Sequence, residues 1–171
     1  SAFFILISLN TNQNTILFIS TIIFGVCIGL YFFNSHPASL FLGDSGAQTL
    51  GFLLGSVAIL YRPESGTQLS TWFVPIMIFF VPLFDLTLVI ISRFKRRKEI
   101  YKASQDHTYH RLSKRGIPIH HSVLMMHGIS LVLSMIGYLC LNLQAIYSNI
   151  IFMISLLLGF LAFIELDRDY N

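Results

Sequence analysis

Charged residues are scarce in this sequence. Only 11% of its 171 residues are Asp, Glu, Lys or Arg, whereas 54% are hydrophobic, and the mean hydropathy is +0.71. A typical soluble domain carries about 25% charged residues, so this shortage argues against a soluble globular protein. The composition is instead typical of an integral membrane protein.

Several common functional signatures are also missing. The two cysteines, Cys27 and Cys140, lie in apolar runs and form no CxxC pair. We therefore interpret them as small buried hydrophobic residues. The sequence contains no P-loop, GxSxG, GxGxxG or HExxH. It also lacks internal repeats, low-complexity segments and the helix-spaced aspartate pairs that a two-metal membrane phosphotransferase needs. Nucleotide, hydrolase and zinc sites of the common kinds are thereby disfavoured.

Positive charge, by contrast, is concentrated in one place. Nine of the eleven Lys and Arg residues lie between Arg93 and Arg115. One dense basic loop beside apolar segments is the positive-inside signature of a membrane protein. The loop has no interleaved aromatic platforms, so we expect no nucleic-acid partner. We expect residues 93–121 to form a cytoplasmic loop.

A membrane span needs roughly 17–25 mainly apolar residues. Five segments qualify, at 16–33, 45–61, 71–92, 122–141 and about 145–164. The core of a bilayer contains no water to hydrogen-bond with the backbone, so each span must pair its own N–H and C=O groups. Each span is therefore predicted to be a helix. Residues 1–9 form an apolar half-run without a basic start or a cleavage site, which we interpret as the end of a truncated helix. We therefore predict an all-α polytopic membrane bundle, with residues 1–171 as one membrane domain.

Counting spans gives the expected topology. If the loop 93–121 is cytoplasmic, helix 71–92 runs inward and helix 45–61 begins on the inner side. The loop 34–44 then faces the cytoplasm too. The two polar segments with candidate chemistry are therefore predicted to share one membrane face.

The first of these segments reads FNSHPASLFLGDSG and contains a single acid, Asp44. Asp is a favoured N-cap residue, and capping accounts for the position of Asp44 as well as any functional explanation does. Capping does not account for the neighbouring residues Asn34, Pro37, Gly43 and Gly46. A hard oxygen ligand for Mg²⁺ at a helix N-terminus would account for them. Asp44 is therefore the first candidate site residue.

The second segment, DHTYHRL, contains two histidines in the basic loop. On a helix, His107 and His110 would share a face, with Asp106 one turn before His110. Zinc needs three or four nitrogen or sulfur ligands in a suitable spacing, and these are lacking. With Arg111 and other cations adjacent, an anion-binding site is favoured. The alternative is a solvated cytoplasmic loop whose histidines have no functional role.

Other polar residues lie at or within the spans. His120 and His121 begin a helix, and we interpret them as interfacial. Asp85 and His127 lie inside spans, where a charge costs roughly 2.5–3.5 kcal/mol on insertion scales. For Asp85 we favour packing or polar support of the active site, and for His127 a hydrogen bond to a neighbouring helix.

Two functions other than catalysis stay open on these residues. An ion or proton transporter could use Asp85 and His127 to line a path, although no span is broken at its centre by a glycine–proline pair. A non-catalytic scaffold could use the basic loop to hold anionic lipid or a partner. The scaffold leaves the glycine-flanked Asp44 unexplained.

Taken together, the two loops resemble those of the polyprenyl-phosphate N-acetylhexosamine-1-phosphate transferases (glycosyltransferase family 4), the superfamily of phospho-N-acetylmuramoyl-pentapeptide transferase. The family stretch N-x-x-P-A-x-x-F-x-G-D-[ST]-G matches Asn34, Pro37, Ala38, Phe41, Gly43, Asp44, Ser45 and Gly46. A later P-x-x-D followed by an Arg matches Pro82, Asp85 and Arg93. The motif D-x-x-H-x-H-H-R-L is matched at His107, His110, Arg111 and Leu112, but Tyr109 replaces its middle histidine.

The resemblance implies a reaction. N-acetylhexosamine-1-phosphate, specifically GlcNAc-1-phosphate, would pass from a UDP-sugar to undecaprenyl or another polyprenyl phosphate with release of UMP. The product would initiate a lipid-linked envelope glycan, such as lipopolysaccharide or teichoic acid. The enzyme would lie in the bacterial inner membrane with its site on the cytoplasmic face, and a homodimer is compatible with this reading.

The resemblance also implies roles for residues. Asp44 would bind Mg²⁺, with Mn²⁺ as an alternative, and His107 and His110 would act on the nucleotide-sugar phosphates. Substrate contacts are implied at Asn34, Gly43, Ser45, Gly46, Arg93 and Arg111, and structural support at Pro37 and Asp85. The acidic DDxxD-type and N-x-x-D-G-x-D-G-type motifs of the family's N-terminal half do not occur here. We therefore expect this chain to be the C-terminal half of the enzyme and inactive alone.

Overall fold

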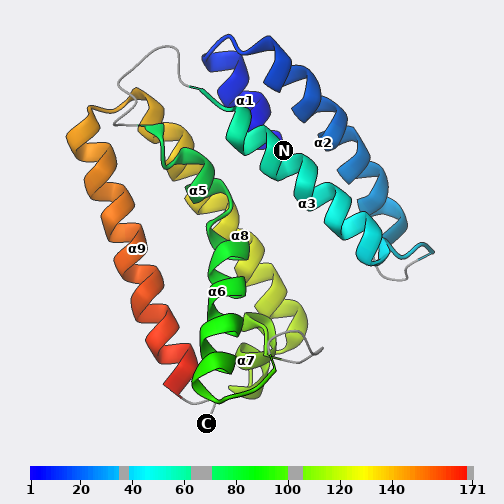
Figure 1. The fold of residues 1–171 in the computed structure, drawn as a ribbon, viewed down its shortest axis with the longest axis vertical. Coiled ribbons are helices and arrows are strands. Elements are labelled where there is room, and N and C mark those ends of the chain that lie inside the picture. Colours follow the sequence, from blue (N-terminus) through cyan, green and yellow to red (C-terminus); the bar gives the residue numbers. More distant parts are fainter. Residues whose placement is uncertain (35–38, 63–70, 100–105, 169–171) are drawn as a thin grey trace. The chain divides into compact units, whose positions relative to one another are not determined.

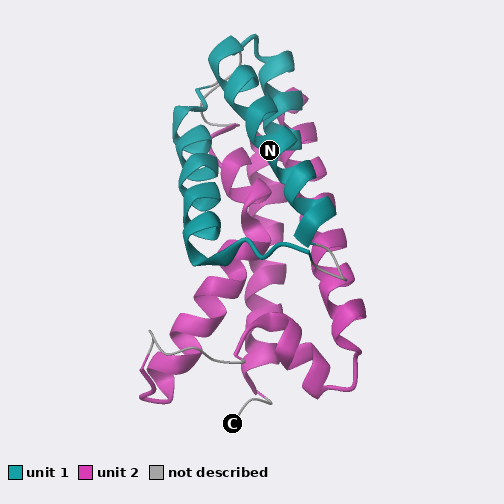
Figure 2. Ribbon diagram, turned by 90° about the vertical axis from the view of Figure 1, so that its right-hand side faces the viewer, with its two compact units in different colours: residues 1–68 teal, residues 69–171 magenta. Residues whose placement is uncertain are grey.

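The computed structural model describes residues 1–34, 39–62, 71–99 and 106–168. Within these ranges the chain forms helices and no strands, which confirms the expected all-helical class. The chain divides into two compact units, residues 1–68 and 69–171 (Figure 2). Each unit is described by itself.

The first unit contains three helices, α1 (Ala2–Asn10), α2 (Asn14–Asn34) and α3 (Gly43–Leu60) (Figure 1). Helix α2 packs against both of the others. The turn between α1 and α2 is closed by the Thr11 hydroxyl, which donates to the Ile7 carbonyl at 2.9 Å. Gln13 donates to that hydroxyl and accepts a hydrogen bond from the Arg62 amide at 3.1 Å. The end of α3 is thereby tied to the first turn of the unit.

Backbone hydrogen bonds at the end of α2 hold the residues that lead into α3. The Phe33 carbonyl accepts hydrogen bonds from the amides of Ser39 and Leu40, at 2.9 and 3.0 Å. The chain then reaches Gly43, whose φ of +66° lies in the left-handed region that glycine adopts without steric cost. Helix α3 begins there, so Asp44 lies in its first turn rather than in the preceding loop.

The second unit contains α5 (Val74–Ile78), α6 (Phe80–Lys95), α7 (Thr108–Lys114), α8 (Ile119–Leu139), the short 3₁₀ turn η1 (Cys140–Asn142) and α9 (Ala145–Arg168). Helix α8 packs against α5, α6 and α7, and α9 packs against α6 and α7. Near one end of the unit, the Phe73 and Phe152 rings stack with centroids 4.7 Å apart, and Trp72 meets both edge-on. Near the other end, α7 lies beside the ends of α6 and α9 (Figure 1).

The expected continuous helix 71–92 is corrected to two helices. Helix α5 ends at Ile78 and α6 begins at Phe80. Pro82 supplies the reason, because it has no N–H to donate to the carbonyl of Ile78 and its ring would clash with that carbonyl. The break therefore follows from Pro82 alone, with no glycine next to it in the sequence.

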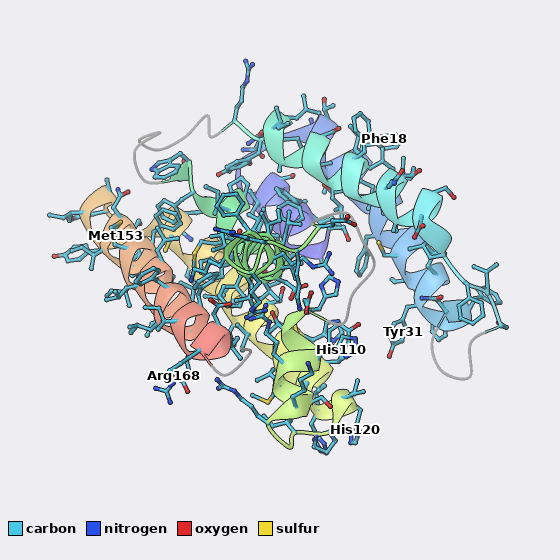
Figure 3. All side chains as sticks on the ribbon, turned by 60° about the horizontal axis from the view of Figure 1, so that its bottom comes forward. Phe18, Tyr31, His110, His120, Met153 and Arg168 are labelled. Atoms are coloured by element: carbon cyan, nitrogen blue, oxygen red, sulfur yellow. The ribbon has the colours of Figure 1, made fainter. Side chains whose placement is uncertain are left out.

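Among the described residues, three helices are long and apolar enough to cross a membrane by length and composition. They are α2, α8 with its continuation to Asn142, and α9. Phe18 and Tyr31 of α2 and Met153 of α9 are exposed and project away from their helices (Figure 3). Large apolar side chains exposed along whole helices suit lipid better than water. The chain is therefore a multi-pass membrane protein.

The packing of α5 against α8 depends on Gly137. A Cβ atom added there would lie 3.0 Å from Met77 Cβ and 3.7 Å from the Val74 carbonyl oxygen. We predict that Gly137→Val destabilises the protein by about 1–3 kcal/mol, the usual cost of overpacking. Gly128→Val, on the same helix and with no atom within 4 Å of the added Cβ, is the matched control. Thermal unfolding in detergent measures both variants, and equal losses would contradict the assignment.

Candidate functional site

The polar residues of the second unit gather where the loop after α6 returns to form α7. Asp85, in the middle of α6, makes the central contact. Its Oδ2 lies 2.8 Å from His107 Nδ1, and its Oδ1 accepts hydrogen bonds from the Thr108 amide at 2.7 Å and hydroxyl at 2.6 Å. The first N–H groups of a helix lack partners within it and favour negative charge. Asp85 therefore supplies the cap of α7 from a different helix.

The two histidines meet through Tyr109. The His107 and Tyr109 rings are nearly parallel, at 7° with centroids 6.0 Å apart, and the Tyr109 and His110 centroids are 4.1 Å apart. His107 is the N-cap of α7 and not part of the helix. The expected shared helix face is thus replaced by a row of three rings. Figure 3 labels His110 on this helix.

Both arginines predicted to contact substrate are buried. Arg93 Nε donates to Asp106 Oδ2 at 2.8 Å, and its Nη1 donates to the Glu99 carbonyl at 2.7 Å. Arg111 Nε donates to the Asp106 carbonyl at 2.9 Å, and its Nη1 to the Leu166 carbonyl at 3.2 Å. These guanidinium groups join α6 and α9 to the residues at the start of α7. Their contact with substrate stays a prediction.

Asp167, near the end of α9, was missed by the sequence reasoning. Its carboxylate pairs with Lys95 Nζ at 3.0 Å, Arg96 Nη2 at 3.2 Å and Arg111 Nη1 at 3.3 Å. Arg115 also contacts Glu165, donating a hydrogen bond to the Glu165 carbonyl and forming an ion pair with the Glu165 carboxylate. The signal was an acidic pair directly after a span, on the side where the positive charges gather. These ion pairs join the ends of α6, α7 and α9.

In the first unit, Asp44 is exposed in the first turn of α3. The N-cap position belongs to Leu42, and no side chain makes a cap hydrogen bond. The capping explanation for Asp44 is therefore not supported. A Cβ atom added at Gly46 would clash with the Leu42 side chain, so a small residue suits this turn.

The other residues of this motif are placed only in part. Asn34 ends α2 and is exposed, as are Gly43 and Ser45 at the start of α3. Pro37, predicted to give structural support, and Ala38 lie outside the described residues. The roles predicted for these residues stay predictions.

The residues around Asp44 can supply one ligand to a metal ion. Asp44 is the single acid in the part of the first unit that the structure describes. Among all described residues, no group of three or more His, Cys, Asp or Glu could hold a metal. Magnesium commonly keeps several waters and binds through one or two carboxylates together with substrate phosphates. Asp44 therefore fits a magnesium ion held largely by phosphate, rather than one in a protein cage.

An apolar cavity of about 420 Å³ lies against the histidine loop. It is lined by all four of the helices α6, α7, α8 and α9, through residues such as Phe84, Leu112, Met126 and Leu158. Thr108, which bonds to Asp85, also lines it. Apolar space thus borders the polar cluster directly.

Some predicted neighbours belong to separate parts of the chain. Asp44 lies in the first unit and the histidines in the second, so their predicted position on one membrane face stays a prediction. His120 and His121 contact each other at the start of α8, with ring centroids 4.1 Å apart. His127 is exposed on the same helix.

The buried ion pair of Arg93 and Asp106 should be critical for stability. Their side chains are only 5% and 9% exposed, so Asp106→Ala leaves the Arg93 cation buried without this carboxylate. We predict a loss of about 3–5 kcal/mol, typical of breaking a buried pair. Lys95→Ala, whose side chain is 57% exposed in its pair with Asp167, should cost about 0–1 kcal/mol. Denaturant unfolding in detergent compares the two, and a smaller loss for Asp106→Ala would refute the prediction.

Comparison with known sequences yields a consistent set of relatives. The sequence model described as glycosyl transferase family 4 matches residues 1–62. A probable undecaprenyl-phosphate N-acetylglucosaminyl 1-phosphate transferase of Bacillus subtilis is 33% identical over 127 residues, covering 74% of this chain and 35% of the relative. No solved structure matches the chain.

Two further relatives carry related names. A phospho-N-acetylmuramoyl-pentapeptide-transferase of Alkaliphilus metalliredigens is 29% identical, covering 83% of this chain and 41% of the relative. A decaprenyl-phosphate N-acetylglucosaminephosphotransferase of Mycobacterium leprae is 29% identical, covering 64% and 30%. This chain therefore spans well under half the length of each of the three relatives.

Proposed function

We propose that this chain, which belongs to glycosyl transferase family 4, works in a membrane enzyme that transfers GlcNAc-1-phosphate from a UDP-sugar to a polyprenyl phosphate. The observation that carries the proposal is the histidine loop held by Asp85 on a cationic frame. Relatives named for N-acetylglucosamine and for the muramoyl-pentapeptide substrate both match, and the Bacillus subtilis relative with 33% identity is named for N-acetylglucosamine. GlcNAc is therefore the preferred sugar.

The reaction brings two anions together. An oxygen of the polyprenyl phosphate attacks the β-phosphorus of the UDP-sugar, a new P–O bond forms, and the diphosphate bond breaks to release UMP. Fixed cations and hydrogen-bond donors must offset the repulsion. In the second unit, Lys95, Arg96 and Arg111 surround the one carboxylate of Asp167, which leaves a surplus of positive charge beside the histidines.

We assign roles to the motif residues on this basis. His107 and His110 contact the phosphates of the nucleotide-sugar, and the exposed carboxylate of Asp44 holds Mg²⁺, or Mn²⁺ in its place. The bound cation would neutralise charge on the diphosphate. Asn34, Gly43, Ser45 and Gly46 would shape the surface around Asp44. Arg93 and Arg111 would support this site through their hydrogen bonds to Asp106, the residue before His107.

The surroundings of the histidine loop support a polyprenyl acceptor and a site on the cytoplasmic face of the membrane. An isoprenoid chain needs apolar space, and the cavity of about 420 Å³ borders Thr108. The basic residues at this end of the second unit favour the cytoplasmic side of a bacterial inner membrane. A UDP-sugar would reach the loop from that side. The glycan made from the product and the homodimer stay predictions.

Asp44 supplies one carboxylate to the proposed metal site, and the described residues offer no acidic cluster around it. We propose that acidic groups outside this chain complete it. This chain by itself should then be inactive. Expressing it with and without the remainder of its protein tests that point.

We predict that membranes with the complete protein convert UDP-GlcNAc and undecaprenyl phosphate to the lipid-linked GlcNAc diphosphate only when Mg²⁺ is present. Asp44→Asn should lower this turnover by about 100-fold or more, the scale for losing an electrostatic contact to the transferred group. Radiolabelled GlcNAc in the lipid phase measures the product. Chelation followed by added Mg²⁺ or Mn²⁺ measures the metal requirement.

Ser56→Ala is the control for this substitution. Ser56 is half-buried on the same helix, and its hydroxyl donates a hydrogen bond to the Phe52 carbonyl of its own turn, so turnover should match that of the unaltered enzyme. Full turnover by Asp44→Asn would remove Asp44 from the metal site. Faster transfer from UDP-MurNAc-pentapeptide than from UDP-GlcNAc would overturn the sugar assignment.

A further inference from the structure

We propose that Asp85 is a positioning residue that keeps a proton on Nδ1 of His107, so that Nε2 is the nitrogen presented to substrate phosphate. The identity of that substrate rests on the proposed function. The arrangement of Asp85 and His107 rests on geometry alone. The two can therefore be tested separately.

The first step is the hydrogen-bond inventory of Asp85. An ionised carboxylate can only accept hydrogen bonds. Its Oδ1 already accepts two from Thr108, from the amide and from the hydroxyl, and its Oδ2 lies 2.8 Å from His107 Nδ1. The contact is a hydrogen bond only if Nδ1 carries the proton. The neutral ring then has its lone pair on Nε2.

The second step is the direction of the ring. The Asp85 side chain is 19% exposed and the His107 side chain is 45% exposed, so the pair runs from the protein interior towards the outside. The Nδ1 edge faces Asp85, which leaves the Nε2 edge on the outer side. No residue in the described ranges forms a hydrogen bond with Nε2. Tyr109, nearly parallel to the ring, further restricts its rotation.

The third step is the chemical consequence. In its protonated state the ring donates a hydrogen bond from Nε2 to a phosphate oxygen, and the Asp85 carboxylate offsets the charge on the ring. A carboxylate has this same effect on the histidine of a Ser–His–Asp triad, where it holds the tautomer and stabilises the imidazolium. Here the histidine faces phosphate and not a serine, and no covalent intermediate is involved.

Asp85→Asn is the decisive substitution. Its amide oxygen can keep both hydrogen bonds from Thr108, and its NH₂ group then faces His107 and donates to Nδ1. The proton of the neutral ring must then move to Nε2. In ¹⁵N NMR of the complete protein labelled at histidine, Nδ1 of His107 should carry a proton in the unaltered protein and lose it in Asp85→Asn. The signal is assigned by its absence in His107→Gln.

Activity gives the second readout. With UDP-GlcNAc and undecaprenyl phosphate, kcat of Asp85→Asn should fall by about 10- to 100-fold, the worth of one charge-assisted hydrogen bond, with a smaller change in KM. Thr108→Val removes one hydrogen bond of the helix cap and leaves Asp85 and His107 in contact. It should retain the proton on Nδ1, which Asp85→Asn should lose.

A pair of substitutions at His107 tests which nitrogen matters. The amide of His107→Gln reaches the position of Nε2, whereas the amide of His107→Asn reaches only that of Nδ1. Gln should therefore retain more activity than Asn. This comparison decides the matter even if Asp85→Asn fails to fold.

Three results would overturn the inference. They are an Nδ1 without a proton in the unaltered protein, an unchanged kcat in Asp85→Asn, and a loss of the Nδ1 proton in Thr108→Val as in Asp85→Asn, which would reduce Asp85 to a helix cap. If the unaltered enzyme does not use UDP-GlcNAc, the proposed function fails, and the NMR measurement still decides the role of Asp85.

Discussion

A carboxylate inside a largely apolar helix must find partners, and this requirement organises the second unit. A charge left unpaired in such surroundings costs several kcal/mol. Asp85 meets the requirement by capturing His107 and Thr108, which starts α7 and brings the histidine loop against α6. The same rule accounts for the neighbouring pairs of Arg93 with Asp106 and of Arg111 with Asp167. Paired charges gather at one end of the unit, and aromatic rings pack near the other.

Pro82 determines where the helix that carries Asp85 begins. It is tolerated in the first turn of a helix but not in a helix interior, so it makes α6 a separate helix from α5. Asp85 follows it by three residues. The carboxylate therefore belongs to a helix whose C-terminal end carries Arg93, Lys95 and the loop that returns to α7. The break in the expected span and the site beside it are parts of one structural feature.

These contacts also bear on the competing functions. A transport path would use Asp85 as a group that exchanges ions or protons, whereas here its carboxylate is fully engaged by the loop that carries the histidines. A passive scaffold would not need an exposed acid at the start of α3 or an imidazole held in one orientation. The proposed transfer between two phosphates would use both features. Catalysis therefore accounts for more of the described residues than either alternative.

The sequence by itself determined the helical class, the apolar segments, the basic loop and the two motifs, because hydropathy and short spacings are local properties. It also identified Asp85, His107 and His110 as candidates. Only the tertiary structure decided which residues they contact. Asp85 meets His107 across 22 positions of sequence and Arg111 meets Asp167 across 56, and no local period encodes such pairings. The burial of Arg93 and Arg111 and their hydrogen bonds to Asp106 likewise depend on packing between elements, which no local pattern predicts.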